Sequence, residues 1–505
     1  MKKSGLIIIS IIGLTLLTRL FQIEKIPGEW FGDISIVSEY VSRILALKWP
    51  LYFEAGVGPF YQYLISPIIF FIGGGFLGLK IASVTVSTAG IIGLYFLGRE
   101  LFSIPVAFIA CLFGAVYFSD LAWSRIGVSS IVFPLMTVII IYSALKFAQN
   151  NSKLFLIIGS LVSSLGLLTY PGAFIYPLLF LILVICGLVK MKKYKRCWYS
   201  IGIIFLCFLP AIIIFASIVR KQPGHFTDGY IGSKIFSISK FSIPDIIKMT
   251  GRNLWRVSTM YHLEGDITFR YNVSKAPHLD KISGIFLILG LFFWFRKKFS
   301  KSWPYILVPL IILPLPSIYP ALPPIETPNI SRTFAMTPMI MLLVSFGFWS
   351  AYEFLKKTKI KIISAIFAVI FGISTYLNLY KYFVTYPLGL PDQNLAPGKI
   401  IANYIDTLPP NTKIHLTSCC WGEWGEPEPK GIYYVLKNQT GKENIIHDEF
   451  ITSCRQVSEG NSSLLIFSPK DLRMINDFKK CFPYARAEDH MDASGVNVFT
   501  TLFLP

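Results

Sequence analysis

The sequence is poor in charged residues. Only 15% of its 505 residues are Asp, Glu, Lys or Arg, whereas 53% are hydrophobic. This composition excludes an ordinary soluble protein and is typical of a chain that crosses a membrane many times. Acidic residues are scarcer still, 28 against 47 Lys and Arg, which leaves a formal net charge of +19. The basic residues stand in short clusters between apolar runs, so they indicate membrane topology and anionic lipid head groups, not nucleic-acid binding.

Three further features are missing or scarce. No small-residue cleavage site follows the first apolar run before Arg19, so we expect a retained helix and not a cleaved signal peptide. The histidines lack metal-ligand spacing. Cysteines are few, and four of the eight fall in a polar tail, at Cys419, Cys420, Cys454 and Cys481. These four could form disulfides if the tail lies outside the cell, or they could stay free thiols.

Apolar runs of membrane-spanning length predict about eleven transmembrane helices. They lie at roughly 4–21, 77–98, 104–120, 128–148, 153–170, 173–190, 199–219, 282–296, 303–319, 333–352 and 361–383. With the N-terminus in the cytoplasm, this count places every dense basic cluster on the cytoplasmic side, as the positive-inside rule requires. The chain is therefore expected to be a multi-pass protein of the cell membrane with an extracytoplasmic C-terminal tail.

The tail after Tyr386 changes to a polar composition with turn residues. Helix-like pieces (399–407, 471–480) alternate with strand-like pieces (413–416, 463–467, 496–503). We therefore predict a polytopic α-helical membrane domain over residues 1–385 and a small extracytoplasmic α/β domain over residues 386–505.

The first loop contains the leading candidate for chemistry, Asp33. The residues after it alternate at helical spacing, with an apolar face of Ile34, Val37 and Val41, which predicts an amphipathic helix in the membrane–water interface. Asp33 could serve as the N-cap of that helix. It could also be a reactive carboxylate at the membrane surface.

Other polar residues collect at the predicted outer ends of the spans, whereas the inner loops are short and basic. Arg125 and Arg332 could extend to lipid phosphates, and Asp120 could be a polar span end. Alternatively, the arginines suit a phosphate or pyrophosphate group, because a guanidinium pairs with its oxygens. Carboxylates at the same depth could hold a divalent cation such as Mg²⁺ or Mn²⁺, or accept a proton from a hydroxyl.

The order of these motifs resembles the superfamily C glycosyltransferases that use lipid-phosphate sugars. The branch with protein O-mannosyltransferases and aminoarabinose lipid A transferases is the most similar. The stretches that carry the resemblance are Gly32-Asp33, Pro59-Phe-Tyr-Gln-Tyr-Leu64, Ser124-Arg125-Ile-Gly127, Gly166-Leu-Leu-Thr-Tyr170, Gly265-Asp266 through Arg270-Tyr-Asn272, and Ser331-Arg332.

This resemblance implies a membrane glycosyltransferase that takes a sugar from a polyprenyl-phosphate donor to an extracytoplasmic hydroxyl of a glycan, lipid or protein. Asp33 and Asp120 would be the catalytic acids, and both would be tentative metal ligands. The implied substrate-binding residues are Glu39, Tyr61, Arg125, Tyr170, Asp266, Arg270, Asn272 and Arg332. Ile34 stands where the family usually has a second acid, so Glu39 or Glu54 would have to replace it.

Two other functions remain open. Eleven spans also suit a transporter or lipid flippase, although no predicted span has acids or bases near its middle. The missing acid at position 34 also permits an inactive membrane scaffold that presents the tail domain.

Overall fold

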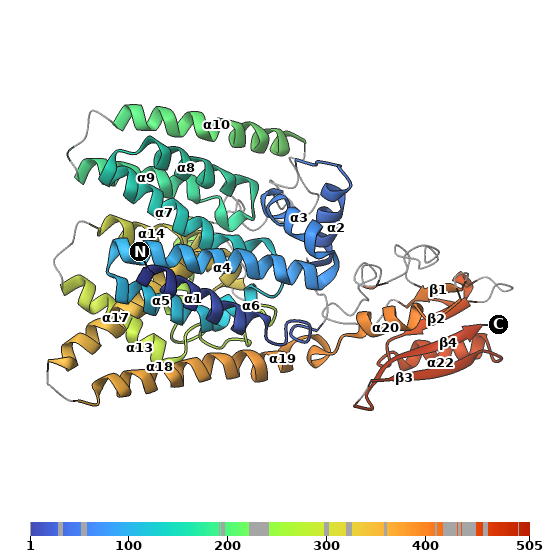
Figure 1. The fold of residues 1–505 in the computed structure, drawn as a ribbon. Helices are drawn as coiled ribbons and strands as arrows, with labels where there is room; N and C mark the ends of the chain where they lie inside the picture. Colours follow the sequence, from blue (N-terminus) through green and yellow to red (C-terminus); the bar gives the residue numbers. More distant parts are fainter. Residues whose placement is uncertain are drawn as a thin grey trace. The chain divides into compact units, whose positions relative to one another are not determined.

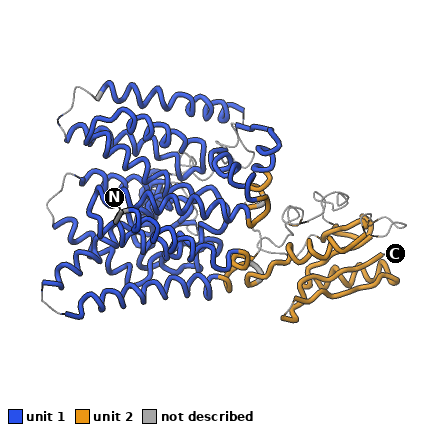
Figure 2. Tube along the Cα trace, viewed as in Figure 1, with its two compact units in different colours: residues 1–23, 40–72, 78–386 blue, residues 24–39, 73–77, 387–505 orange. Residues whose placement is uncertain are grey.

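The computed structural model describes residues 2–28, 34–51, 58–190, 192, 197–221, 242–296, 302–319, 326–357, 361–409, 412–417, 432, 436, 451–457, 463–492 and 494–504. Helices make up the part before the small C-terminal sheet (Figure 1). Two compact units result (Figure 2): Met1–Ile23, Tyr40–Ile72 and Gly78–Tyr386 form unit 1, and Glu24–Glu39, Gly73–Leu77 and Pro387–Pro505 form unit 2.

The longer helices of unit 1 follow the apolar runs of the sequence. They are α1 (Lys2–Leu20), α3 (Phe60–Ile72), α4 (Gly75–Leu101), α5 (Ile104–Val116), α7 (Val132–Asn150), α8 (Lys153–Ser164), α9 (Tyr176–Lys190), α10 (Cys197–Lys221), α13 (Lys281–Arg296), α14 (Pro304–Ile312), α17 (Thr337–Lys356) and α18 (Ile363–Tyr380). A further helix, α12 (Ile243–Thr259), mixes charged and apolar residues and was not predicted from an apolar run. The amphipathic helix predicted after Asp33 is present as α2 (Ile34–Leu45).

Within the described residues, six helices are long and apolar enough to cross a membrane. They cover Gly75–Leu101, Ser129–Asn150, Pro171–Lys190, Trp198–Lys221, Ile330–Lys356 and Ile363–Gly389. Five shorter apolar helices accompany them: Gly5–Leu20, Phe60–Ile72, Ile104–Val116, Lys153–Leu168 and Pro304–Ile318. A multi-pass membrane protein is therefore confirmed, while the count of eleven spans stays a prediction.

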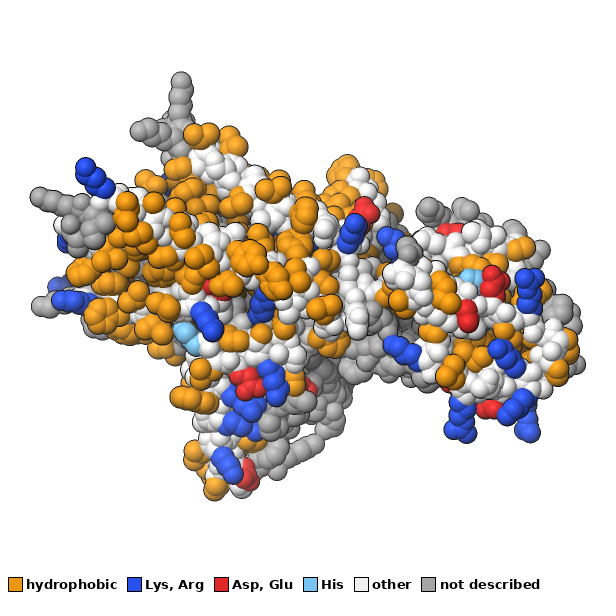
Figure 3. Space-filling model, turned by 90° about the horizontal axis from the view of Figure 1, so that it is seen from below, with side chains coloured by type: hydrophobic (Ala, Val, Ile, Leu, Met, Phe, Trp, Pro, Cys, Tyr) orange, Lys and Arg blue, Asp and Glu red, His pale blue; other side chains and the backbone are white. Residues whose placement is uncertain are grey.

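The helices of unit 1 differ in how deeply they are buried. The span containing α17 is 83% buried, whereas those containing α10 and α18 are each 22% buried. The centre of the bundle thus lies at α17, and α10 and α18 present apolar side chains outward, as lipid-facing helices do. Figure 3 shows one hydrophobic face of this kind.

Unit 2 contains the small sheet that the sequence predicts. The sheet has the strand order β1-β2-β4-β3, formed by β1 (Lys413–Leu416), β2 (Ser463–Phe467), β4 (Asn497–Leu504) and β3 (Arg486–Met491). β1 runs parallel to β2, and β4 pairs antiparallel with both β2 and β3. All five tail elements predicted from the sequence lie within two residues of observed helices or strands at both ends, and the predicted strands 413–416 and 463–467 coincide with β1 and β2. The strand β3 was not predicted.

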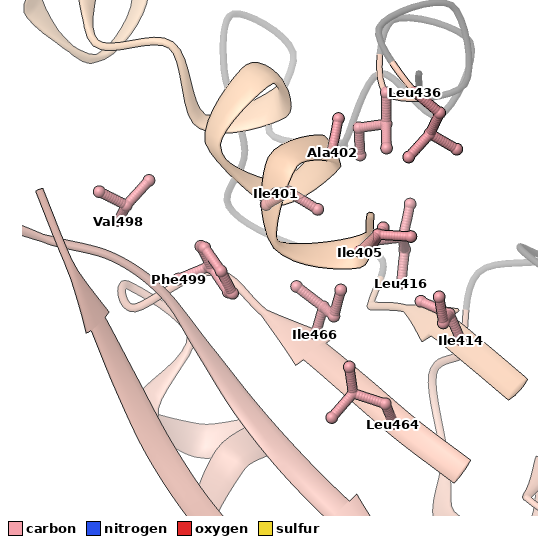
Figure 4. Close-up of a cluster of buried hydrophobic side chains, with 11 residues drawn as sticks. Ile401, Ala402, Ile405, Ile414, Leu416, Leu436, Leu464, Ile466, Val498 and Phe499 are labelled. Carbon is pink, nitrogen blue, oxygen red and sulfur yellow. The ribbon is translucent and has the colours of Figure 1, made fainter. Parts of the chain in front are cut away.

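Alternation along β2 explains how the sheet is covered on both faces. Leu464 and Ile466 pack with Ile405 of α20 (Pro397–Ile405) (Figure 4). Their neighbours Leu465 and Phe467 point to the opposite face and pack with Phe478 of α22 (Leu472–Cys481). All five residues of β2 are buried because a helix covers each side.

Two covalent or polar links tie segments of unit 2 together. Cys454 and Cys481 form a disulfide, so two of the four tail cysteines are paired; Cys419 and Cys420 lie outside the described residues. Asn394 accepts a hydrogen bond from the Gly28 amide at 2.7 Å and donates to the Lys25 carbonyl at 2.8 Å. These bonds explain why residues 24–28 group with the tail and not with the helical bundle.

Candidate functional site

The first-loop residues are only partly described. Asp33 and Glu54 lie outside the described residues. Glu39 is a half-buried residue of α2 and belongs to unit 2. Tyr61 of α3 is fully buried, and its hydroxyl is 2.7 Å from the Ser83 hydroxyl of α4.

The segment just before α3 is hydrogen-bonded to the stretch that leads into the Tyr170-Pro-Gly turn, which lies between α8 and α9. The Gly58 amide donates to the Thr169 carbonyl at 3.0 Å. A Cβ at Gly58 would lie 2.2 Å from the Leu168 carbonyl oxygen, so only glycine permits this approach. The beginning of α3 is thereby held against the stretch that leads to Tyr170.

The Tyr170-Pro-Gly turn in turn packs against the segment that carries Arg332. A Cβ on Gly172 would lie 3.1 Å from the Arg332 Cα. Arg332 sits in the short helix α16 (Ile330–Thr333), at the start of the central span Ile330–Lys356. Tyr170 and Arg332, 162 positions apart in sequence, therefore belong to one local cluster.

Arg332 and Arg125 are buried arginines with unused donors. Their exposed fractions are 3% and 0%. In the described part of the chain, the Nε and Nη1 atoms of Arg332 have no hydrogen-bond partner, nor do the three guanidinium nitrogens of Arg125. Unpartnered buried guanidinium groups are costly, so an anionic ligand would stabilise both.

Among the described residues, the guanidinium group of Arg125 contacts aromatic rings and not hydrogen-bond acceptors. Its guanidinium carbon lies 5.1 Å from the ring centre of Tyr382 and 5.5 Å from that of Phe383. Both rings come from consecutive residues of a π-helix, η9 (Lys381–Thr385), which continues α18. Cation–π contacts stabilise the charge without occupying its N–H groups, so the fork stays available to phosphate oxygens.

The two arginine-bearing segments pack against each other. Trp123, at the end of α6 (Phe118–Trp123), stacks on Phe334 with ring centres 5.4 Å apart. Tyr271 covers the Trp123 ring at 4.2 Å with an interplanar angle of 12°. Trp123 precedes Arg125 by two residues, and Phe334 follows Arg332 by two. The aromatic stack therefore joins both arginine segments to the long loop of residues 260–280, which contains Tyr271 and lies between α12 and α13.

Asp266 anchors that long loop. Its carboxylate accepts hydrogen bonds from the Thr268 amide at 2.8 Å and from the Ile330 amide at 2.9 Å. Burial raises the pKa of Asp266. The backbone amide of Asp266 points to Nε2 of His278 at 3.3 Å, and burial lowers the pKa of His278 to about 3. A neutral imidazole can accept from that amide, so these residues order the loop beside Arg332.

Asn272 and Arg270 connect the loop to the end of α18. Asn272 accepts a hydrogen bond from the Lys381 ammonium at 3.0 Å and donates to the Asp266 and Ala276 carbonyls. The Arg270 carbonyl accepts a hydrogen bond from the Tyr386 hydroxyl at 2.6 Å. In this arrangement the Asn272 side chain and the Arg270 backbone support the loop, whereas substrate binding by either residue stays a prediction.

Asp120 is buried in an ion pair that the sequence analysis did not anticipate. Its carboxylate lies 3.2 Å from the Arg19 guanidinium, and the Ser87 hydroxyl approaches its other oxygen at 3.4 Å. Arg19 also donates to the Ala115 and Gly114 carbonyls at 2.9 and 3.3 Å. The contacts favour a positioning role for Asp120, which joins α1, α4 and α6.

A metal site finds little support among the described residues, where no group of three or more His, Cys, Asp or Glu side chains is placed to hold an ion. Asp120 fits a cation poorly because Arg19 already occupies the space beside its carboxylate. Asp33, the other tentative ligand, lies outside the described residues. Metal binding therefore stays a prediction, and no catalytic step is assigned to a metal ion.

Two cations were not singled out by the sequence analysis. Lys80 is 1% exposed near the start of α4, where its ammonium donates to the Ile23 carbonyl. Lys381 bonds Asn272 and the Pro277 carbonyl, and its ammonium lies 4.2 Å from the Phe118 ring centre. Both stand alone in apolar sequence, and an isolated lysine in a span is by default a functional candidate.

Part of this cluster lies in a segment that matches a known protein family. Residues 56–214 match the family model described as dolichyl-phosphate-mannose-protein mannosyltransferase. The stretch contains Tyr61, Arg125 and Tyr170. Over this stretch, the resemblance to dolichyl-phosphate-mannose-protein mannosyltransferases expected from the motifs is confirmed. No curated protein sequence matches the chain.

Solved structures establish the fold over the whole length. ArnT from Cupriavidus metallidurans bound to undecaprenyl phosphate has a TM-score of 0.59 at 11% identity, covering 99% of this chain and 98% of that chain. The apo state of the same ArnT has a TM-score of 0.59 at 10% identity, with 100% and 98% covered. AglB from Archaeoglobus fulgidus, in complex with an inhibitory peptide and a dolichol-phosphate, has a TM-score of 0.47 at 12% identity, with 80% and 58% covered.

Proposed function

We propose that this chain, which has the fold of ArnT, is a membrane glycosyltransferase. It transfers a sugar from a polyprenyl-phosphate donor to a hydroxyl group of an extracytoplasmic acceptor. The match of residues 56–214 to dolichyl-phosphate-mannose-protein mannosyltransferases supports the donor class. The undecaprenyl phosphate bound to ArnT is a ligand of the same chemistry.

The observation that carries the proposal is the pair of buried arginines. Arg125 and Arg332 come from segments that an aromatic stack holds together, and their guanidinium nitrogens include five without a partner in the described chain. Planar N–H forks match phosphate oxygens in geometry and charge. A phosphate that becomes a leaving group gains negative charge in the transition state, so fixed cations stabilise that state more than the ground state.

In the proposed reaction, the acceptor hydroxyl attacks the anomeric carbon of the donor sugar. The bond between that carbon and the phosphate oxygen breaks, and polyprenyl phosphate leaves while Arg125 and Arg332 neutralise it. Asp33 takes the proton of the hydroxyl. Since Ile34 replaces the usual second acid, Glu39 or Glu54 is the proposed partner carboxylate. An oxocarbenium-like transition state is expected, as in other glycosyl transfer.

The Cys454–Cys481 disulfide supports an extracytoplasmic tail, because disulfides persist in oxidising compartments. We therefore keep the proposed orientation, with the N-terminus in the cytoplasm and the tail outside. Labelling of the protein in intact spheroplasts with a membrane-impermeant thiol reagent tests this orientation. After reduction, Cys454 and Cys481 should be labelled from the outside.

The activity test uses purified protein and a panel of radiolabelled polyprenyl-phosphate sugars with envelope acceptors. Transfer should occur with at least one pair, and Asp33→Asn should abolish it while the protein still folds. Arg125→Met and Arg332→Met should each lower kcat at least 100-fold, because removal of one transition-state donor typically has this effect. Arg220→Met is the matched control: Arg220 is an exposed arginine at the end of α10.

Full activity of Asp33→Asn would refute the proposed base. Unchanged activity of both arginine variants would refute the proposed phosphate site. A chelator arm addresses the divalent cation: loss of transfer with EDTA and recovery with Mg²⁺ or Mn²⁺ would support a metal, and unaffected transfer would remove it from the proposal.

A further inference from the structure

A cavity system lies at the opposite end of the bundle from the arginine pair. Its larger part has a volume of about 650 Å³ and is lined by the last residues of α13 and α17. α17 begins five residues after Arg332 and ends at Lys356, 20 residues in all. At about 1.5 Å per residue, this length separates the cavity from Arg332 by roughly 30 Å, the thickness of a bilayer core.

The cavity exists because α13 and α17 touch closely before it opens. A Cβ on Gly290 would lie 2.0 Å from the Leu343 carbonyl oxygen, and one on Gly347 would lie 2.0 Å from the Phe286 carbonyl oxygen. The two backbones are therefore in contact at these glycines. Beyond them, the bulky residues Phe293 of α13 and Trp349 of α17 line the cavity.

The charged lining of the cavity is mostly basic. Arg296, Lys356 and Lys357 contribute three positive groups, and Glu353 contributes one carboxylate. The Lys356 ammonium lies 5.5 Å from the ring centre of Tyr352, which keeps the cation at the cavity wall. A net positive lining beside aromatic rings fits a phosphate at the level of membrane head groups.

Most of the side chains that line an adjoining cavity are apolar, although polar groups share its surface. This cavity has a volume of about 330 Å³ and shares Trp349 and Glu353 with the first. Its other walls include Phe102, Val106 and Ile306. A hydrocarbon chain is a suitable occupant for such walls, whereas an inorganic phosphate or a soluble phosphate ester would leave them without a partner.

We propose that these two cavities together bind an anionic glycerophospholipid from the leaflet on that side. Its phosphate contacts Arg296, Lys356 and Lys357, and one acyl chain lies against Phe102, Val106 and Ile306. The site is independent of the proposed glycosyl transfer, since it lies at the other membrane face.

The test is a titration of the full-length protein in detergent micelles, with the first binding event followed by native mass spectrometry. Palmitoyl-oleoyl phosphatidylglycerol should bind at least tenfold more tightly than the phosphatidylcholine with the same chains. A basic residue near a phosphate contributes about fivefold. The triple variant Arg296→Gln/Lys356→Gln/Lys357→Gln should therefore weaken phosphatidylglycerol binding on the order of 100-fold.

A second variant, which is expected to tighten binding and not weaken it, keeps the test decisive if the triple variant folds poorly. Glu353→Gln removes the one acid that lines the cavity among the described residues and should tighten binding of phosphatidylglycerol about fivefold. The charge-matched control, Lys192→Gln/Arg220→Gln/Lys221→Gln, removes three exposed cations that do not line either cavity and should bind like the wild type.

Three results would overturn the proposal. One is equal affinity of the wild type for the two phospholipids. Another is equal weakening in the triple variant and the charge-matched control. The third is displacement of phosphatidylglycerol by millimolar glycerol 3-phosphate, which would indicate a site for a free phosphate ester.

Discussion

Replacement of Asp120 by Asn separates a structural role of this residue from a catalytic one. The carboxylate is 5% exposed and lies 3.2 Å from Arg19, which is itself 0% exposed. Asn has the same shape and retains an oxygen toward the guanidinium. The substitution therefore removes the negative charge and leaves most of the hydrogen-bond geometry.

The expected loss is about 3 to 5 kcal/mol in the free energy of unfolding, because Arg19 becomes an uncompensated buried charge. The lower end of this range is the better estimate. Arg19 keeps its bonds to the Ser87 hydroxyl at 3.0 Å and to the Ala115 carbonyl at 2.9 Å, which continue to satisfy part of the guanidinium. The double variant Arg19→Met/Asp120→Leu should regain most of the loss, since apolar side chains of similar volume often replace a buried pair at little cost.

Equilibrium unfolding in mixed micelles of rising SDS content, followed by tryptophan fluorescence, measures these free energies. The control is Asp477→Asn, which removes an exposed ion pair with Lys480 at 3.8 Å and should change the free energy of unfolding by less than about 0.5 kcal/mol. A loss below about 1 kcal/mol for Asp120→Asn, together with abolished sugar transfer, would refute the structural role and favour the catalytic one.

Three further predictions concern packing, covalent structure and pH. Cys454→Ser/Cys481→Ser should destabilise the tail by about 3.5 kcal/mol, the chain-entropy value for a sequence separation of 27, as measured by hydrogen exchange of β2. Gly290→Ala should lower the free energy of unfolding by about 1 to 3 kcal/mol or more, because its Cβ would overlap the backbone of α17. The control is Gly13→Ala, where a Cβ would have no atom within 4 Å, so this substitution should be neutral or slightly stabilising in the same unfolding assay. Burial lowers the pKa of His415, so the unfolded chain binds more protons below about pH 6.5 and the tail should lose stability as the pH falls through that range; His415→Gln should remove this part of the pH dependence in corrected hydrogen-exchange free energies.

Local elements were the most predictable part of the fold. The strands at 413–416 and 463–467 match β1 and β2 residue for residue, because short apolar runs between turn residues have few alternatives. β3, with the sequence Arg-Ala-Glu-Asp-His-Met, was missed. It is an edge strand that pairs only with β4 and is almost entirely exposed, so burial leaves no pattern in its sequence.

The candidate site was predictable in its membership more than in its contacts. Arg125, Tyr170, Asp266 and Arg332 were all expected, and the structure groups their segments through the Gly172 contact, the Ile330 amide and the Trp123–Phe334 stack. The roles of Lys381 and the π-helix were not expected. They depend on which residues a turn of helix brings under Arg125, and spacing along the chain does not encode this.

The sequence by itself determined that the chain spans a membrane repeatedly, roughly where most of its apolar helices lie, and which residue types suit a lipid-phosphate ligand. These properties follow from hydropathy and local chemistry, which each segment carries alone. Only the tertiary structure decided that Asp120 faces Arg19 and that Arg125 lies on two aromatic rings with its donors unused. A charge takes its role from its neighbours in space, and those neighbours come from helices up to 258 positions apart, as for Arg125 and Phe383.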